Sequence, residues 1–127
     1  MSREYKVRDV MLEKPVTVQE DETVNNAVRK MAELNIGAIP VVNEKGKIVG
    51  IFSERDLLRR VAAKGLSYNT KIKEVMTRNP VTISPEATVE KAKDVMAKIK
   101  ARHLPVIDEN GHLVGVVSLS DIEFSVY

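Results

Sequence analysis

The sequence predicts an α+β protein made of two β-α-β-β-α repeats that pack about a pseudo-two-fold axis. Three observations lead to this fold class: an internal repeat, an alternation of helical and strand-like hydrophobic patterns, and a length of 127 residues. When residues 10–57 are aligned with residues 75–122, 18 of the 48 pairs are identical, where chance would give roughly three. Neither half is large enough to bury a good core alone, so the halves are expected to pack together.

Each repeat begins with an extended segment that leads into an amphipathic helix. In the first repeat, residues 15–18 are strand-like and Thr23 is placed to start the helix. Apolar residues then recur every three or four positions in both repeats, which predicts one buried helix face in each. The two apolar sets are Val24, Ala27, Val28, Met31 and Leu34, and Val89, Ala92, Val95, Met96 and Ile99. Both methionines are expected to fill the core.

A β-hairpin follows the helix in each repeat. Gly46 and Gly111 occupy the last loop position, where a left-handed backbone lets the chain return. Pro40 and Pro105 are expected at strand starts, where the missing N–H does not break a central ladder. The strand-like runs are residues 39–42 and 47–52, and then 104–107 and 113–117.

A second helix follows each hairpin, from Glu54 to about residue 63 and from Leu119 to about residue 124. Polar residues and a glycine then connect the repeats. The predicted boundaries are 7–62 for the first domain, 63–71 for the linker and 72–125 for the second domain.

Composition excludes several classes of protein. Cysteine is absent, which excludes disulfides, cysteine-ligated zinc, iron–sulfur clusters and thiol catalysis. The net charge is only +2 and the two signs are interleaved, so no general nucleic-acid field is predicted. No window approaches 18 consecutive apolar residues and the N-terminus lacks an apolar signal core. A soluble, cytoplasmic protein without a membrane association is therefore expected.

The motif Gly-x-x-Ser-x-x-Asp ends each hairpin, at residues 50–56 and 115–121. One interpretation is structural: Ser53 and Ser118 cap the following helices, and the aspartates three residues later close a capping box. The other is functional: the aspartate accepts hydrogen bonds from the two hydroxyls of a ribose, and the helix N-terminus faces a phosphate. A helix start can serve both roles, so both interpretations remain open.

The ordered β-α-β-β-α elements, with Pro-Val before each hairpin and Gly-x-x-Ser-x-x-Asp after it, resemble a tandem pair of cystathionine-β-synthase (CBS) domains, or Bateman module. The resemblance covers about residues 7–124 and implies a stand-alone CBS domain protein. Such modules bind adenosine nucleotides, or sometimes S-adenosylmethionine, between the two repeats and signal to a partner enzyme, channel or transporter. They usually dimerise into a flat disk of four repeats. The resemblance thus implies an energy-sensing homodimer that binds AMP, ADP or ATP and regulates an unidentified protein, without a catalytic cofactor.

The resemblance implies a first ligand site around Asp121. Its carboxylate would hold the ribose, with Ser118 and Ser120 beside it. Arg102 and His103 match family positions that contact phosphate, where a planar guanidinium binds two oxygens at once. The adenine wall would come from the other repeat and consist of Val16, Ile36, Gly37 and Ala38.

The resemblance implies a second ligand site around Asp56 and Ser53, with Arg102 reaching across from the other repeat. Here Arg55 stands where the other repeat has Ser120. Arg55 either binds a phosphate, or fills the pocket and pairs with an acid so that the site stays empty. The apolar wall of this site would be Ile51, Val81 and Ala101.

Other functions have less support in the sequence. The sequence has two histidines, no cysteine and none of the motifs Gly-x-Ser-x-Gly, His-Glu-x-x-His and Gly-x-x-x-x-Gly-Lys, which argues against an enzyme. No catalytic residue and no metal site is therefore predicted. S-adenosylmethionine is a cation without phosphate, so the positive residues favour a nucleotide. Single-stranded nucleic acid is disfavoured because no aromatic residue is interleaved with the basic ones. A dimerisation scaffold with empty ligand sites is the remaining alternative.

Overall fold

The computed structural model describes residues 4–126 and confirms a mixed α+β protein with two repeats of the same pattern. The chain divides into two compact units. The β3–β4 unit comprises Val16–Pro80, and the β6–β7 unit comprises the residues up to Pro15 and from Val81 onward. Packing of the two repeats about a pseudo-two-fold axis stays a prediction.

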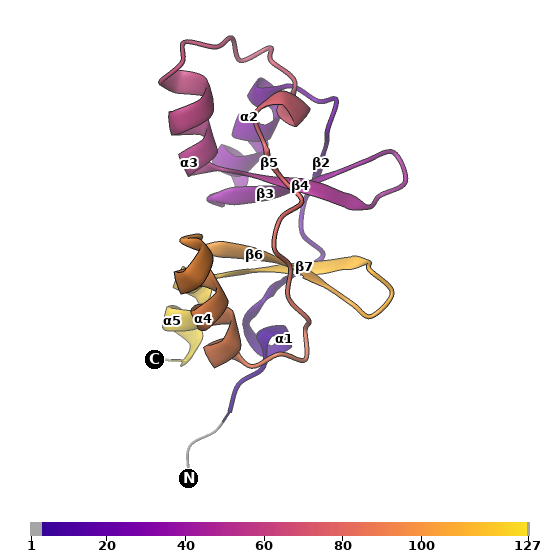
Figure 1. The fold of residues 1–127 in the computed structure, drawn as a ribbon, viewed down its shortest axis with the longest axis vertical. Coiled ribbons are helices and arrows are strands. Elements are labelled where there is room, and N and C mark those ends of the chain that lie inside the picture. The colour runs from indigo at the N-terminus through magenta and orange to yellow at the C-terminus, as the bar shows by residue number, and fades with distance from the viewer. Residues whose placement is uncertain (1–3, 127) are drawn as a thin grey trace. The chain divides into compact units, whose positions relative to one another are not determined.

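The β3–β4 unit contains eight elements. They are β2 (Val18–Gln19), α2 (Val24–Leu34), β3 (Ala38–Val42), β4 (Ile48–Ser53), α3 (Glu54–Asp56), the π-helix η1 (Leu57–Ala62), the 3₁₀-helix η2 (Ile72–Glu74) and β5 (Thr77–Arg78). The sheet order is β2-β3-β4-β5, and only the β2–β3 pair is parallel. Helices α2 and α3 lie on one face of this sheet (Figure 1).

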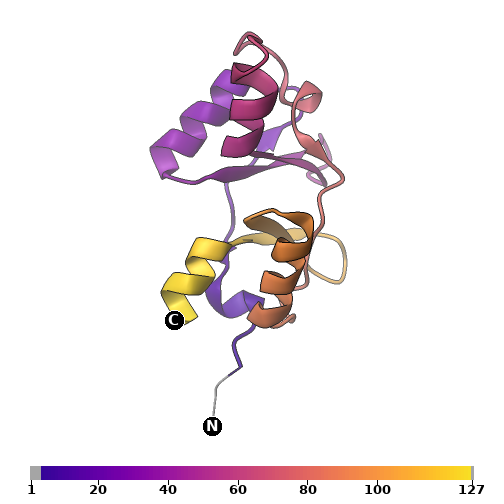
Figure 2. The same cartoon turned by 60° about the vertical axis from the view of Figure 1, so that its left-hand side comes forward.

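The β6–β7 unit has the same plan. Its elements are α1 (Val7–Val10), β1 (Leu12–Glu13), α4 (Val89–Ile99), β6 (His103–Ile107), β7 (Leu113–Ser118) and α5 (Leu119–Val126). The sheet order is β1-β7-β6, and Ile83 adds a parallel bridge to Val106 where the other unit has β2. Helices α4 and α5 lie on one face of this sheet (Figure 2). Among the described residues, no helix combines the length and apolar character needed to span a bilayer.

The two repeats exchange their first extended segments. Strand β5 belongs to the second sequence repeat but pairs antiparallel with β4 of the first, with Thr77 opposite Ile51. Strand β1 belongs to the first repeat but pairs with β7 of the second, with Leu12 opposite Val116. Each sheet is therefore completed by a strand from the other repeat.

Equivalent ion pairs hold the exchanged segments. Lys73 lies 3.0 Å from Asp21 in the β3–β4 unit, and Arg8 lies 3.0 Å from Glu86 in the β6–β7 unit. The Lys73 ammonium holds the pKa of Asp21 below its ordinary value. Because these side chains are exposed, their charge pairing adds little stability and weakens with salt.

Gly50 and Gly115 are glycines because the exchanged strands approach them closely. A Cβ on Gly50 would lie 2.5 Å from Met76 Sδ and 2.9 Å from the carbonyl oxygen of Thr77. A Cβ on Gly115 would lie 2.7 Å from Met11 Sδ and 2.9 Å from the carbonyl oxygen of Leu12. The ends of the methionine side chains can move, but a backbone oxygen moves only with its strand. Glycine is therefore required at this position for the exchanged strand to lie so close.

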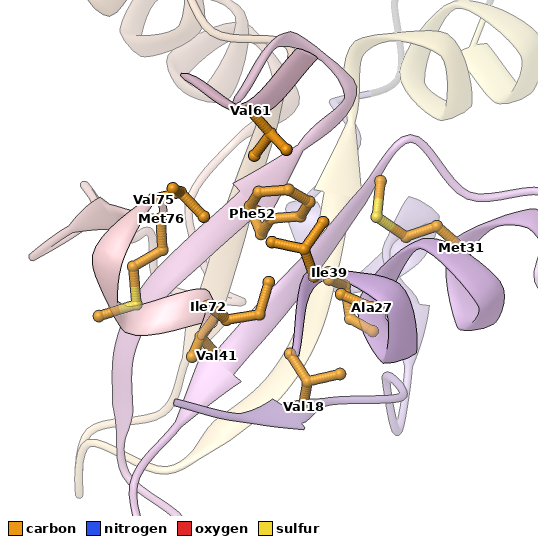
Figure 3. Close-up of a cluster of buried hydrophobic side chains, with 11 residues drawn as sticks. Val18, Ala27, Met31, Ile39, Val41, Phe52, Val61, Ile72, Val75 and Met76 are labelled. Carbon is orange, nitrogen blue, oxygen red and sulfur yellow. The ribbon is translucent and has the colours of Figure 1, made fainter. Parts of the chain in front are cut away.

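Each unit has its own hydrophobic core. In the β3–β4 unit, Phe52 and Ile39 from the sheet pack with Val61 from the helix that follows it (Figure 3). Met31 and Met96 are buried as predicted, at 5% and 2% exposed. The predicted apolar stripes are too long by one residue, because each helix ends there.

Leu34 and Ile99 are the terminal residues of those stripes, and they are 49% and 41% exposed. Both occupy the last position of their helices, and the next residues, Asn35 and Lys100, adopt left-handed φ values of 54° and 57°. At the start of α2, the Thr23 hydroxyl accepts a hydrogen bond from the Asn26 N–H, which confirms the predicted helix start.

The predicted hairpins are confirmed, but the position of their prolines is not. Gly46 and Gly111 adopt left-handed φ values of 77° and 81°. Pro40 is the third residue of β3 rather than its first, and Pro105 is the third residue of β6. These central positions are tolerated because the neighbouring parallel segment begins to pair only beyond each proline. Strand β2 pairs with β3 from Val41, and Ile83 bridges to β6 at Val106.

The second helices differ between the units. The helix that starts at Glu54 widens into the π-helix η1, where the Ala63 N–H donates to the Leu58 carbonyl oxygen at 2.8 Å. Its counterpart α5 is α-helical throughout and runs two residues beyond the predicted end at 124.

Replacing Gly50 or Gly115 by alanine is expected to cost about 1–3 kcal/mol, because the added methyl forces the exchanged strand away from its partner. Urea denaturation measures the loss. Gly46→Asn is the control, since a Cβ at Gly46 meets open space and asparagine tolerates a left-handed φ. Alanine variants as stable as the control would contradict the close-approach explanation.

Acid is expected to destabilise the second hairpin through Asp108. Its Oδ1 accepts hydrogen bonds from the N–H groups of His112 and Asn110, both at 2.9 Å, and the His112 bond is the main cause that lowers the pKa of Asp108. A lowered pKa stabilises the fold above the ordinary value of 3.8 and loses that contribution as pH falls through the folded value.

The test is Asp108→Asn, because Asn43 makes the same turn in the first hairpin with an amide oxygen. The thermal midpoint of the variant is expected to fall less than that of the wild type between about pH 6 and pH 3. Equal losses in both proteins would show that this carboxylate does not contribute.

Candidate ligand-binding site

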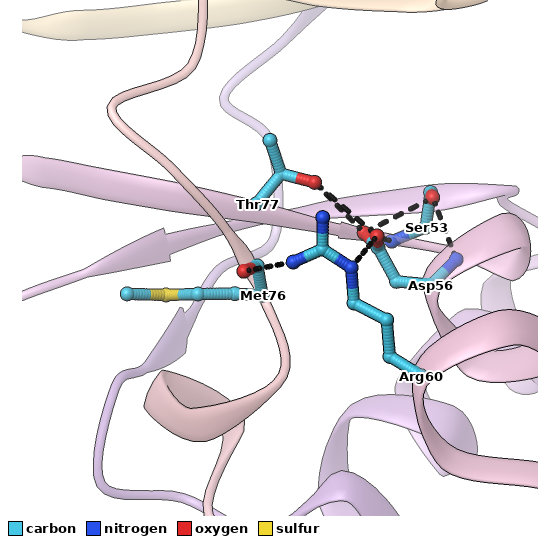
Figure 4. A network of polar contacts seen from close by, with 5 residues as sticks. All are labelled: Ser53, Asp56, Arg60, Met76 and Thr77. Carbon is cyan, nitrogen blue, oxygen red and sulfur yellow. Dashed lines mark hydrogen bonds and ion pairs between the residues drawn. The ribbon is translucent and has the colours of Figure 1, made fainter. Parts of the chain in front are cut away.

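Asp56 lies at the start of α3 and is buried, at 6% exposed. Its Oδ2 accepts hydrogen bonds from the Ser53 N–H at 3.0 Å and from the Ser53 hydroxyl at 3.1 Å. The Ser53 Oγ in turn accepts a bond from the Asp56 N–H at 3.2 Å (Figure 4). This is the capping box that the structural interpretation of the motif predicted, and it is confirmed.

Two further side chains reach the Asp56 carboxylate. The Thr77 hydroxyl on β5 donates to Oδ1 at 3.2 Å, and Arg60 Nε lies 3.5 Å from the same oxygen. Arg60 also donates from Nη1 to the Met76 carbonyl oxygen at 2.9 Å. The start of α3, the helix after it and the exchanged strand are thus joined at one buried carboxylate (Figure 4).

Asp121 is the equivalent residue of α5, and its surroundings are different. Its N–H donates to the Ser118 Oγ at 3.0 Å, so Ser118 caps the helix as predicted. The predicted capping box is wrong here, because the Asp121 carboxylate does not accept the reciprocal bond from the Ser118 N–H. The Asp121 side chain is exposed. Within residues 4–126, its carboxylate has no hydrogen bond and no ion pair.

The difference follows from two substitutions between the repeats. The position equivalent to Thr77 is Leu12, which has no donor and is 49% exposed. The position equivalent to Arg60 is Ser125, whose side chain is too short to reach back one helical turn. The carboxylate of Asp121 is therefore available where that of Asp56 is not.

Arg102 and His103 lie beside the start of α5. The Leu119 N–H donates to the Arg102 carbonyl oxygen at 2.9 Å, and His103 pairs with Ser118 across the β6–β7 ladder. The structure thus brings these two residues to the same helix start as Asp121. In the β3–β4 unit the equivalent places, beside Glu54 and Ser53, are taken by uncharged residues, Gly37 and Ala38.

The remaining predicted site residues divide between the units. Ile51, Ser53, Arg55 and Asp56 lie in the β3–β4 unit together with Val16, Ile36, Gly37 and Ala38. Val81, Ala101, Arg102, His103, Ser118, Ser120 and Asp121 lie in the β6–β7 unit. Each predicted site draws on both units, so its full assembly stays a prediction.

The sequence interpretation missed Thr77 and Arg60 as partners of Asp56. Arg60 could have been found from its spacing, because residues four apart on a helix are neighbours. Thr77 lies 21 residues away in the other sequence repeat, and only the strand exchange brings it to Asp56.

Within residues 4–126, the acidic and histidine side chains form no group of three that a metal ion would require. His112 in the second hairpin instead lies 3.5 Å from the Asp108 carboxylate through Nδ1.

Comparison with known proteins identifies the family. The sequence model of the CBS domain matches residues 7–63 and 72–125, so the chain belongs to the CBS domain family. It is 38% identical over 116 residues to the CBS domain-containing protein YhcV of Bacillus subtilis (strain 168), covering 91% of this chain and 81% of YhcV. The resemblance stated from the sequence is therefore confirmed.

Solved structures agree with this family. The CBS domain pair of protein MJ0100, in complex with 5-methylthioadenosine and S-adenosyl-L-methionine, is 29% identical with a TM-score of 0.87 and covers 96% of this chain and 95% of that one. CBSX2 in complex with AMP is 25% identical with a TM-score of 0.80, and the match covers 95% of each chain.

The two aspartates are expected to differ in their contribution to stability. Asp56→Ala removes the acceptor of four donor groups, which come from Ser53, Thr77 and Arg60, and is expected to cost about 2–3 kcal/mol. Asp121→Ala removes an exposed acid from the first turn of a helix and is expected to cost less than about 1 kcal/mol. Urea denaturation of both variants measures the difference. Equal losses would contradict the contrast between the two carboxylates.

Proposed function

We propose that this protein is a regulatory module that binds an adenosine nucleotide through Asp121 and signals its presence to a separate protein. One observation carries the proposal: an exposed carboxylate without a protein partner among the described residues lies at a helix start, beside an arginine and a histidine. A lone helix start is common in proteins, but this combination provides a hydroxyl acceptor and phosphate ligands together.

The chemistry of a nucleotide matches these residues. The two vicinal ribose hydroxyls donate hydrogen bonds to the Asp121 carboxylate. The Arg102 guanidinium and the N-terminus of α5 attract the phosphates. The adenine is expected to lie against apolar residues of the other unit, namely Val16, Ile36, Gly37 and Ala38.

Charge supports a nucleotide over S-adenosylmethionine. CBSX2 was crystallised with AMP, whereas MJ0100 was crystallised with S-adenosyl-L-methionine and 5-methylthioadenosine, so related structures hold both kinds of ligand. In this chain Arg102 and His103 lie beside the start of the helix that carries Asp121, and a positive charge there favours phosphate over a sulfonium cation. S-adenosylmethionine is the second candidate, on the strength of MJ0100.

The proposed role is regulation without catalysis. A ligand acts as a signal only by binding two conformations of the module with different affinity, and an affinity ratio of about five to ten changes their balance by about 1 kcal/mol. The protein that this module would regulate is unidentified.

A homodimer is part of the proposal. Phe124 on α5 and Leu58 on η1 support it, because they are large apolar side chains that are 94% and 65% exposed. A second copy of the chain would cover them.

Calorimetric titration tests the proposed function. AMP, ADP and ATP are each expected to bind the wild type, and Asp121→Asn is expected to weaken binding at least tenfold, because an amide is a poorer acceptor for two hydroxyls than a carboxylate. Arg102→Gln is expected to weaken ATP and AMP binding while leaving adenosine binding unchanged.

His112→Gln is the matched control, since His112 lies in the second hairpin and is expected to leave every affinity unchanged. Preference of the wild type for S-adenosylmethionine over all three nucleotides would contradict the phosphate argument. Absence of binding by every adenosine ligand would contradict the proposed function itself.

A further inference from the structure

We infer that each chain binds a single adenosine ligand, at Asp121, because Thr77 and Arg60 already occupy the carboxylate of Asp56. The inference rests on the proposed function and decides which of the two motif aspartates performs it. Thr77 and Arg60 then determine which of the two aspartates binds the ligand, although neither residue would contact it.

The acceptor capacity of Asp56 is filled. A carboxylate offers about four lone-pair sites. At Asp56, Oδ2 accepts from the Ser53 N–H and hydroxyl, and Oδ1 faces the Thr77 hydroxyl and Arg60 Nε. A ribose needs two of these places, so it has to displace donors that are already bound.

Displacement is costly because the competing donors are held by the backbone. Thr77 is fixed in β5 by its pairing with Ile51 on β4. Arg60 is held by its second bond, to the Met76 carbonyl oxygen. A ribose would exchange protein hydrogen bonds for an equal number of new ones and leave the threonine and arginine without their acceptor.

Asp121 carries no such cost. Its carboxylate bonds to no protein donor among residues 4–126, so every bond to a ribose replaces only water. The two halves thus carry the same motif but differ in whether its carboxylate is free, and the difference is encoded outside the motif, at positions 12 and 77 and at positions 60 and 125.

Stoichiometry tests the inference. AMP is titrated calorimetrically into the wild type, Asp56→Ala and Asp121→Ala, with folding verified by circular dichroism. We expect one equivalent of AMP per chain in the wild type, a similar affinity in Asp56→Ala, and loss of the site in Asp121→Ala. If Asp56→Ala does not fold, Thr77→Val replaces it, since it removes only the hydroxyl, and it too is expected to retain the site.

A transfer of the two donors tests their role directly. Leu12→Thr with Ser125→Arg copies Thr77 and Arg60 into the β6–β7 unit, and AMP affinity is expected to fall at least about tenfold. Leu12→Val with Ser125→Ala is the control, because valine matches threonine in shape without its hydroxyl, and it is expected to bind as the wild type does.

The outcomes separate the two proposals. Two equivalents of AMP in the wild type, loss of binding in Asp56→Ala, or unchanged affinity in the Leu12→Thr, Ser125→Arg variant would overturn the single-site inference and leave the nucleotide-binding function standing. Failure of the wild type to bind AMP, ADP, ATP or S-adenosylmethionine would overturn the proposed function, and the inference with it.

Discussion

The exchange of extended strands between the two repeats is the constraint on which the rest of the structure depends. Strand β5 lies against Gly50 and strand β1 against Gly115 so closely that a single methyl group at either glycine would meet a backbone oxygen. Neither sequence repeat completes its own sheet, and each needs the other to supply its last strand.

The same exchange makes the two halves chemically different. A residue on an exchanged strand faces the motif of the other repeat. Position 12 belongs to the first repeat but lies in the unit of Asp121, and position 77 belongs to the second repeat but lies beside Asp56. The Thr77 hydroxyl donates a hydrogen bond to the carboxylate of Asp56, whereas Leu12 has no group that could donate one to the carboxylate of Asp121. In the proposed single-site arrangement, the duplicated module keeps the fold of both halves and binds ligand in one of them.

Much of the fold could be predicted from the sequence, because short-range sequence patterns determine most of its helices and turns. Helix starts at threonine, glycine turns and apolar periodicity all depend on neighbours a few residues apart, and the structure confirms them. Leu34 and Ile99 belong to the predicted apolar stripes but are largely exposed, because periodicity does not show where a helix ends. Pro40 and Pro105 were placed wrongly because the position at which the neighbouring parallel segment begins to pair, at Val41 and at Val106, is not a local property.

The candidate site was less accessible to prediction than the fold. The spacing of Ser53 and Asp56 predicted that the pair either caps a helix or binds a ligand. The contact of Asp56 with Thr77 arises from strand exchange, which no local pattern encodes.

The most direct measurement is a crystal structure of the protein with AMP. The account predicts ribose hydroxyls on Asp121 and an undisturbed Thr77–Asp56 bond. A ribose bound to Asp56 with Thr77 displaced would contradict it.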